Sequence, residues 1–171
     1  MEHLKNIIRD IPDFPKAGIL FRDITPLLAD AESLRETVNA LVAPYRDAGI
    51  TAIAAMEARG FIFGGLAADA LGTGFVPLRK PGKLPYETIS ESYDLEYGAA
   101  SLEIHADALD ERDTVLLIDD LIATGGTAVA SCRLVERLGA RVAGLAFIIE
   151  LDGLNGRSAL ADYHVHSLVH Y

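Results

Sequence analysis

The chain has 171 residues, of which 50% are apolar and 23% are charged, which is the composition of a globular protein rather than of a disordered or fibrous one. This length is most simply one domain, large enough to bury roughly two thirds of the surface that the unfolded chain exposes. The formal net charge of −10, with 25 acids, 15 bases and no long basic cluster, argues against nonspecific nucleic-acid binding.

The first residues show no targeting signal. Residues 1–6 lack the apolar core of a signal peptide, and no run in the chain approaches the roughly 18 apolar residues of a membrane span. We therefore expect a cytoplasmic protein with no membrane contact.

Two helices are predicted in the first third of the chain. Apolar residues recur at helical spacing over 4–11, and Pro12 ends that pattern. A second apolar face runs over about 30–48, with Gly49 as the stop signal. The residues on that face are Leu34, Val38, Leu41, Val42 and Tyr45.

Buried strands then alternate with helices along the rest of the chain. Strands are predicted at 50–56, 75–78, 114–118, 142–149 and 164–169, and helices at 61–71 and 126–138. Because the strands are continuously apolar, this alternation indicates an α/β fold with a mostly parallel sheet covered by helices on both faces. Ligands of such sheets bind at the carboxyl ends of the strands, so residues 57–60, 79–83 and 119–127 are expected along one rim.

The segment 80–98 is polar and rich in turn-forming residues. A segment of this length inside a compact domain is more often a functional lid than a plain connection. Alternation of apolar and polar residues resumes over 93–97 and again over 102–104, which predicts a hairpin turned near Gly98.

The motif with the clearest chemistry occupies residues 115–127, Val-Leu-Leu-Ile-Asp-Asp-Leu-Ile-Ala-Thr-Gly-Gly-Thr. It predicts a buried strand, a loop of accessible backbone N–H groups and a helix N-terminus, which together form a phosphate site. Asp119 and Asp120 suit the vicinal hydroxyls of a ribose. The small residues that leave room for a phosphate are Ala123, Thr124, Gly125, Gly126 and Thr127. A ligand-free strand-turn-helix connection is the alternative interpretation.

This motif is not the loop of nucleoside-triphosphate hydrolases, because no Lys follows the two glycines. It resembles the phosphoribosyl-pyrophosphate (PRPP) motif of the type I phosphoribosyltransferases, without a break over its 13 residues.

Basic residues gather near the expected rim. Arg59 follows a predicted buried strand and can bind phosphate oxygens in a bidentate manner. Arg79, Lys80 and Lys83 lie beside the predicted lid, where this local positive charge in an acidic protein indicates an anion site. A solvated loop with chance charges is the alternative for the two lysines. Pyrophosphate is a leaving group that needs such neutralisation, usually with a divalent metal.

Four further segments make the resemblance narrower. With the PRPP motif they are similar, in order and spacing, to the adenine phosphoribosyltransferase family, and they span most of the chain up to Asp152. They are Gly-Ile-Leu-Phe-Arg-Asp-Ile-Thr-Pro at 18–26, Glu-Ala-Arg-Gly-Phe-Ile-Phe-Gly at 57–64, Arg-Lys-Pro-Gly-Lys-Leu-Pro at 79–85 and Tyr-Asp-Leu-Glu-Tyr-Gly at 93–98.

The resemblance implies one type I phosphoribosyltransferase domain over 1–171, with a base-binding hood over about 1–30 and a flexible lid hairpin over about 80–98. It also implies a purine-salvage enzyme that transfers the 5-phosphoribosyl group of PRPP to adenine, giving AMP and pyrophosphate. The family uses Mg²⁺, which is expected to be held mainly by PRPP and water rather than by protein ligands. A homodimer is implied in the same way.

The family's site residues transfer onto matching positions of this chain. Leu20, Phe21 and Arg22 would line the adenine pocket, with Phe21 stacked on the purine. Glu96 would take a proton near N7 as the glycosidic bond forms, and Tyr97 would help to close the lid. From the residues alone, the alternative interpretation is that Phe21 is a buried core residue and that Glu96 lies on the solvent face of a strand.

The PRPP half of the site is implied in the same way. Arg59 would act in catalysis and hold pyrophosphate together with Arg79, Lys80 and Lys83. Residues 119–120 would hold the ribose hydroxyls, and residues 123–127 the 5′-phosphate.

Two other functions stay open. A phosphoribosyltransferase for an oxopurine would share the PRPP half of the site and differ around residues 21–22. A non-catalytic PRPP or nucleotide sensor would be expected to carry a DNA-binding extension or a basic face, and the sequence shows neither.

The histidines and the single cysteine receive no catalytic role. His164, His166 and His170 have ligand-like spacing, but no acid cluster appears beside them in the sequence, so we expect an exposed final strand rather than a metal site. Cys132 lies in a predicted helix, where packing is its expected role.

Overall fold

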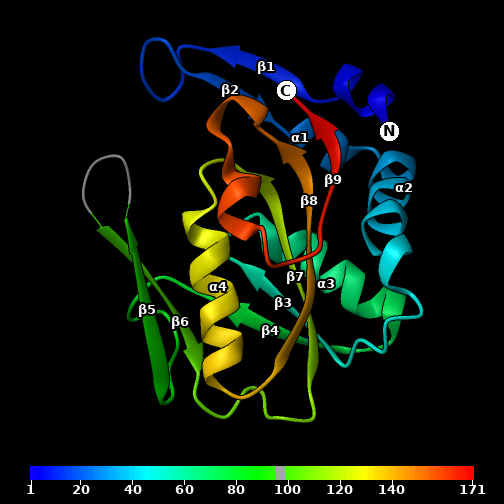
Figure 1. Ribbon diagram of the computed structural model, residues 1–171. Coiled ribbons are helices and arrows are strands. Elements are labelled where there is room, and N and C mark those ends of the chain that lie inside the picture. Colours follow the sequence, from blue (N-terminus) through cyan, green and yellow to red (C-terminus); the bar gives the residue numbers. More distant parts are fainter. Residues whose placement is uncertain (95–98) are drawn as a thin grey trace.

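A five-stranded parallel sheet forms the centre of the computed structural model, which describes residues 1–94 and 99–171 (Figure 1). Its strand order is β4-β3-β7-β8-β9. The strands are β3 (Ala52–Met56), β4 (Gly74–Leu78), β7 (Thr114–Ile122), β8 (Arg141–Glu150) and β9 (Val165–His170). The parallel α/β sheet predicted from the continuous apolar runs is confirmed.

Two layers of helices and strands cover the sheet (Figure 1). The helices α2 (Ala31–Val42) and α3 (Gly60–Leu71) pack on one face, and α4 (Gly126–Arg137) packs on the other together with the hairpin of β5 (Thr88–Asp94) and β6 (Ala99–His105). A hydrophobic core lies on each face of the sheet. Each strand contributes side chains to both cores, because successive side chains point to opposite faces. Ile53 and Leu116 belong to the α2–α3 core, whereas Ala54 and Leu117 belong to the α4 core.

The N-terminal segment is a separate two-stranded sheet rather than a helix. The helix predicted over 4–11 is wrong: a short 3-10 helix η1 (Glu2–Asn6) is followed by β1 (Arg9–Pro12), which pairs antiparallel with β2 (Leu20–Asp23). The apolar spacing reflects burial of Leu4 and Ile8, and long-range pairing of β1 overrides the local helical pattern. Helix α1 (Thr25–Ala29) follows β2.

Helix α2 is shorter than the predicted segment 30–48. It begins at Ala31, directly after the N-cap residue Asp30, whose carboxylate accepts a hydrogen bond from the Ser33 N–H at 2.8 Å. It ends at Val42, and a 3-10 turn η2 (Ala43–Tyr45) follows. Pro44 explains the early end, because a proline ring clashes with the preceding helical turn and offers no N–H donor.

Strand β7 is longer than predicted. The acids were expected to follow a strand ending at residue 118, but β7 continues to Ile122 and holds both acids in its last part. The long strand β8 extends the ladder, because Asp119 pairs with Phe147 and Ile122 pairs with Glu150.

The last strand, β9, is not the exposed strand expected from the sequence, since Leu168 is 8% exposed and Val169 is fully buried. β9 pairs with β8 and packs against α2, which removes these side chains from water. The remaining predicted strands and helices are found within a few residues of their expected bounds. The antiparallel pairing of the predicted hairpin is confirmed by β5 and β6, while its turn near Gly98 lies outside the described residues. None of the helices in the described part of the chain is long and apolar enough to cross a membrane.

Candidate active site

The loop at residues 123–127 connects β7 to α4 at the carboxyl edge of the sheet. Gly125 has a φ of 86°, a left-handed conformation that a residue with a Cβ adopts only at a cost, and α4 begins directly after it. The loop lines a cavity of about 170 Å³, whose apolar walls include Met56 and Phe147. The N-terminus of a helix of 12 residues therefore faces a small cavity, which is the geometry that binds a phosphate.

Asp119 lines this cavity, which we call the loop pocket, whereas its neighbour Asp120 does not. Asp120 is 5% exposed, and its Oδ2 lies 2.5 Å from Nε of Arg59. Asp119 lines the cavity, and its Oδ1 accepts a hydrogen bond from the Asp120 N–H at 2.9 Å. Burial, together with the neighbouring Asp120 carboxylate, raises the pKa of Asp119 well above its usual value. The Asp119 carboxyl therefore loses its proton less readily than an ordinary aspartate does.

A second cavity, of about 320 Å³, brings the predicted rim segments together. We call it the rim pocket. It is lined by Glu57, Ala58, Arg59, Lys80, Tyr93, Leu102, Asp119, Asp120, Leu121 and Thr127. The expectation that residues 57–60, 79–83 and 119–127 share one edge of the sheet is confirmed.

Arg59 connects the acids to the N-terminal sheet. Its guanidinium carbon lies 5.4 Å from the centre of the Phe21 ring, while its Nε contacts Asp120. Phe21 in turn packs edge-on against Phe14, with 5.1 Å between ring centres. An aromatic face, a guanidinium and a carboxylate therefore follow one another along the edge of the site, with the aromatic face next to the cation.

The other two residues expected in the base pocket lie differently. Leu20 is 46% exposed. The side chain of Arg22 is directed elsewhere: it donates to the Asp10 carboxylate and stacks on the Tyr171 ring, 3.7 Å from the ring centre. The structure thus brings Phe21, but not the Arg22 guanidinium, next to Arg59.

The basic segment 79–83 is organised by hydrogen bonds within the protein. Nε of Arg79 lies 2.7 Å from Oε2 of Glu57, and its Nη1 donates to the Lys83 carbonyl at 3.0 Å. The Gly82 N–H donates to Glu103 at 3.0 Å. Arg79 therefore holds this loop in place, whereas Lys80 and Lys83 are exposed and Lys80 lines the rim pocket.

The expected catalytic acid–base Glu96 and the lid residue Tyr97 lie outside the described residues. Tyr93 is described, and it lines the rim pocket from the end of β5. Strand β5 is held on α4 by Glu91, which pairs with Arg133 at 3.2 Å and with Arg137 at 3.1 Å.

Gly156 is a site residue that the sequence interpretation missed. A Cβ on Gly156 would lie 2.2 Å from the Ala123 carbonyl oxygen and 2.9 Å from the Gly125 nitrogen. The 3-10 helix η4 (Gly156–Leu160) thus packs directly on the backbone of the loop pocket. The Asn155-Gly156 dipeptide is the signal that marks a tight turn here, although it does not reveal what the turn contacts.

One group of possible metal ligands lies at the end of β8 and β9. Ligand atoms of Glu150, Asp152 and His170 lie within 4.8 Å of one another, so the fold brings two acids to one of the three C-terminal histidines, which the sequence did not predict. Both carboxylate oxygens of Glu150 are already paired with the Arg157 guanidinium, with Nε–Oε1 and Nη2–Oε2 distances of 2.9 and 2.5 Å. Because of this guanidinium and the imidazole, the group does not suit Mg²⁺, which prefers oxygen ligands. Cys132 is fully buried, as expected for a packing residue.

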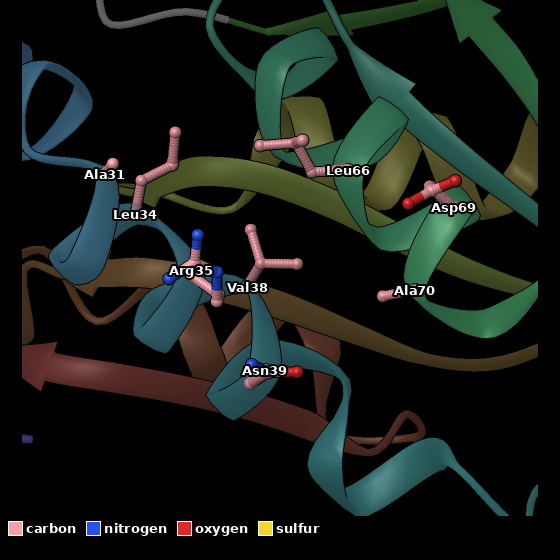
Figure 2. Close-up of a pocket in the computed structure, with 8 residues that line it drawn as sticks. All are labelled: Ala31, Leu34, Arg35, Val38, Asn39, Leu66, Asp69 and Ala70. Atoms are coloured by element: carbon pink, nitrogen blue, oxygen red, sulfur yellow. The ribbon is translucent and has the colours of Figure 1, made fainter.

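A groove away from the site separates α2 from α3 (Figure 2). Leu34 and Val38 of α2 face Leu66 of α3 across it. Leu66 is 39% exposed and Ile62, one turn earlier on α3, is 42% exposed. Arg35, Asn39 and Asp69 also line the groove, which is separate from the loop and rim pockets.

Comparisons with known proteins agree with this geometry. The model of the phosphoribosyl transferase domain matches residues 28–168. The chain is 65% identical to the adenine phosphoribosyltransferase of Nitrosococcus oceani and 66% identical to that of Methylococcus capsulatus, over 100% of both chains in each case.

Solved structures with the same fold lead to the same family. The adenine phosphoribosyltransferase of Rhodothermus marinus superposes with a TM-score of 0.95 at 53% identity, over 99% of this chain and 97% of that one. That of Saccharomyces cerevisiae, solved with an imino-altritol bisphosphate and adenine, gives a TM-score of 0.92 at 40% identity, over 98% and 97% of the two chains. The chain belongs to the phosphoribosyltransferase family and, within it, to the adenine phosphoribosyltransferases.

Proposed function

We propose that this chain transfers the 5-phosphoribosyl group of PRPP to adenine, giving AMP and pyrophosphate in purine salvage. The observation that carries the proposal is the continuous edge formed by the loop at 123–127, the two acids, Arg59 and Phe21. A helix N-terminus suits the 5′-phosphate, the acids suit the ribose diol, and the aromatic ring suits a purine. The related Trypanosoma brucei enzyme was solved with AMP, pyrophosphate and ribose-5-phosphate, which are the molecules that such an edge accommodates.

On the PRPP side, the backbone N–H groups and hydroxyls of residues 123–127 bind the 5′-phosphate. Asp119 and Asp120 accept hydrogen bonds from the ribose hydroxyls, and both stabilise positive charge that develops on the ribose as pyrophosphate leaves. Arg59, Arg79, Lys80 and Lys83 neutralise the pyrophosphate. The Arg59–Asp120 contact of 2.5 Å keeps the buried carboxylate paired until substrate arrives.

On the adenine side, Phe21 stacks on the purine, while Leu20 and the backbone at Arg22 form the rest of the pocket. Adenine N9 attacks the anomeric carbon, the bond to pyrophosphate breaks with its electron pair, and Glu96 accepts the proton that the base loses. The role of Glu96 rests on the family resemblance. Residues 1–171 act as one domain, in which residues 1–30 form a hood over the base and residues 80–98, including Tyr97, form a lid that excludes water.

Mg²⁺ is the proposed cofactor. The carboxylates at 119–120 are hard oxygen donors, but Arg59 occupies one of them and the surroundings disfavour charge on the other. The protein therefore leaves most of the coordination to PRPP oxygens and water. When bound, the ion neutralises charge on the leaving pyrophosphate.

We also propose a homodimer in which a second copy covers the α2–α3 groove. Its support is the exposed apolar pair Ile62 and Leu66 beside that groove, since exposed apolar patches mark interaction sites. The cytoplasmic location expected from the sequence stays a prediction, which fractionation of the native host's cells would check.

The reaction is tested by pyrophosphate release from PRPP and Mg²⁺, with adenine, hypoxanthine, guanine or no base in parallel reactions. Release with adenine alone supports the proposal. Release with an oxopurine in place of adenine would keep the reaction and refute the assignment of the base pocket. PRPP binding without release for any base would instead indicate a sensor.

A further inference from the structure

The strands β1 and β2, which we call the hood sheet, lie between elements that are anchored in the core by Leu4, Ile24 and Leu27. Among the described residues, β1 and β2 pair with each other, and neither joins the ladder of the central sheet. Figure 1 shows the pair lying across the end of the sheet at which β8 and β9 finish, beside the C-terminus. Besides the buried Ile24 that follows β2, the contacts from that end of the sheet therefore help to set the position of β2 and of Phe21.

Arg22 makes one of these contacts, with Tyr171. Its guanidinium lies 3.7 Å from the centre of the Tyr171 ring, close enough for a strong cation–π contact. Its Nη1 also donates to Asp10, its pairing partner across β1 and β2. The Arg22 side chain is only 14% exposed, so this stack is shielded from water and fixes the orientation of the guanidinium.

Tyr171 is itself held by the central sheet. Its N–H donates to the Glu150 carbonyl at 3.0 Å, and its carbonyl accepts from the Asp152 N–H at 2.9 Å. Its hydroxyl is buried and has no hydrogen-bond partner among the described residues, and its ring makes the contact with Arg22. The backbone of Tyr171 is thus fixed by hydrogen bonds at the ends of β8 and β9, and this sets the position of its ring.

Phe21 is the residue before Arg22 on β2, so the two side chains point to opposite sides of the strand. On one side Arg22 stacks on Tyr171, and on the other Phe21 lies 5.4 Å from Arg59. A shift of β2 that loosens the first contact also displaces the second.

We propose that Tyr171 is a positioning residue for adenine: by stacking on Arg22 it fixes β2 so that Phe21 faces Arg59 across the base site. The inference rests on the proposed function, because it assumes that adenine stacks on Phe21. It assigns no role to Tyr171 in binding PRPP, since the loop at 123–127 lies on a different connection of the sheet.

The test compares Tyr171→Ala and Tyr171→Phe with the wild type in steady-state AMP formation, varying adenine and PRPP separately. Tyr171→Ala is expected to raise the KM for adenine about tenfold and to leave the KM for PRPP within about twofold. Tyr171→Phe keeps the ring and is expected to stay within about twofold of the wild type. If the Ala variant does not fold, Tyr171→Leu removes the aromatic face while keeping apolar volume and gives the same test.

Tyr163→Ala serves as the matched control, because it removes another partly buried tyrosine, whose hydroxyl donates to Glu136 at 2.9 Å on α4. It is expected to lower Tm without changing the ratio of the two KM values. An unchanged KM for adenine in Tyr171→Ala, a loss confined to kcat, or a Phe variant as impaired as the Ala variant would each overturn the inference. A wild type that forms no AMP would overturn the proposed function itself.

Discussion

Replacement of Gly156 by alanine perturbs the loop pocket from outside the substrate site. The added Cβ would lie 2.2 Å from the Ala123 carbonyl oxygen, far inside van der Waals contact, and the neighbouring atoms are backbone rather than a flexible side chain. The two backbones are also close at Gly125, where an added Cβ would lie 2.6 Å from the Gly156 carbonyl oxygen. Either η4 or the loop at 123–127 has to shift.

The expected magnitudes follow from this overlap. Overpacking of this kind costs about 1–3 kcal/mol, which lowers Tm by roughly 2–12 °C for a chain of this length. A displaced loop also weakens charge-assisted hydrogen bonds to the 5′-phosphate. At about 1.5–3 kcal/mol for one such bond, kcat/KM for PRPP is expected to fall about 10- to 100-fold.

Gly153→Ala provides the control, because Gly153 has open space at its Cβ position, no positive φ, and lies in the same connection. The assay is AMP formation at saturating adenine with PRPP varied, alongside thermal unfolding of both variants. The control is expected to change stability by less than about 0.5 kcal/mol and to keep the wild-type kinetics. A Gly156→Ala variant with wild-type kcat/KM for PRPP would refute the claim that η4 positions the loop.

Four further predictions address the acids, the thiol, the dimer surface and the lid. Because the pKa of Asp119 is raised above its usual value of 3.8, its ionised form destabilises the fold as pH rises past that value. Asp119→Asn is therefore expected to raise Tm at pH 7, to leave Tm unchanged near pH 3, and to lower kcat/KM for PRPP about 10- to 100-fold; a lower Tm at pH 7 would contradict this. Burial raises the pKa of the Cys132 thiol to about 12, so a disulfide reagent at pH 8 should label the native protein at least about 100-fold more slowly than the unfolded protein. Leu66→Glu is expected to shift the mass measured by light scattering from dimer to monomer, whereas Leu154→Glu, at a site that is 45% exposed in the wild type, should not; equal masses for both variants would exclude the α2–α3 surface. Glu96→Gln is expected to lower kcat by about 100-fold or more with PRPP affinity nearly intact, and an unchanged kcat would remove Glu96 from the chemistry.

The sequence was most informative where a pattern is repeated or chemically unusual. Continuous apolar runs predicted the parallel strands, because a strand buried on both faces has no polar side. The paired acids before Thr124 and the two glycines located the loop pocket, since acids at the end of a buried strand have little structural use. The rule that ligands bind at the carboxyl edge predicted that Arg59 and Lys80 share one rim, and both line the rim pocket.

The predictions that were wrong share a physical cause, which is pairing between residues that are distant in the chain. The spacing of Leu4 and Ile8 is compatible with a helix, and only the partner strand β2 turns the following residues into β1. The extension of β7 past residue 118 depends on β8 in the same way. The close approach of Gly156 to the loop and the stack of Arg22 on Tyr171 are also tertiary contacts, which no local pattern encodes.

A crystal structure with AMP bound tests the account of the site most directly. The account predicts the phosphate on the backbone N–H groups of residues 124–127, the ribose hydroxyls within hydrogen-bond distance of Asp119 and Asp120, and the purine stacked on Phe21. A phosphate bound at Lys80 and Lys83 instead, or a purine away from Phe21, would contradict it.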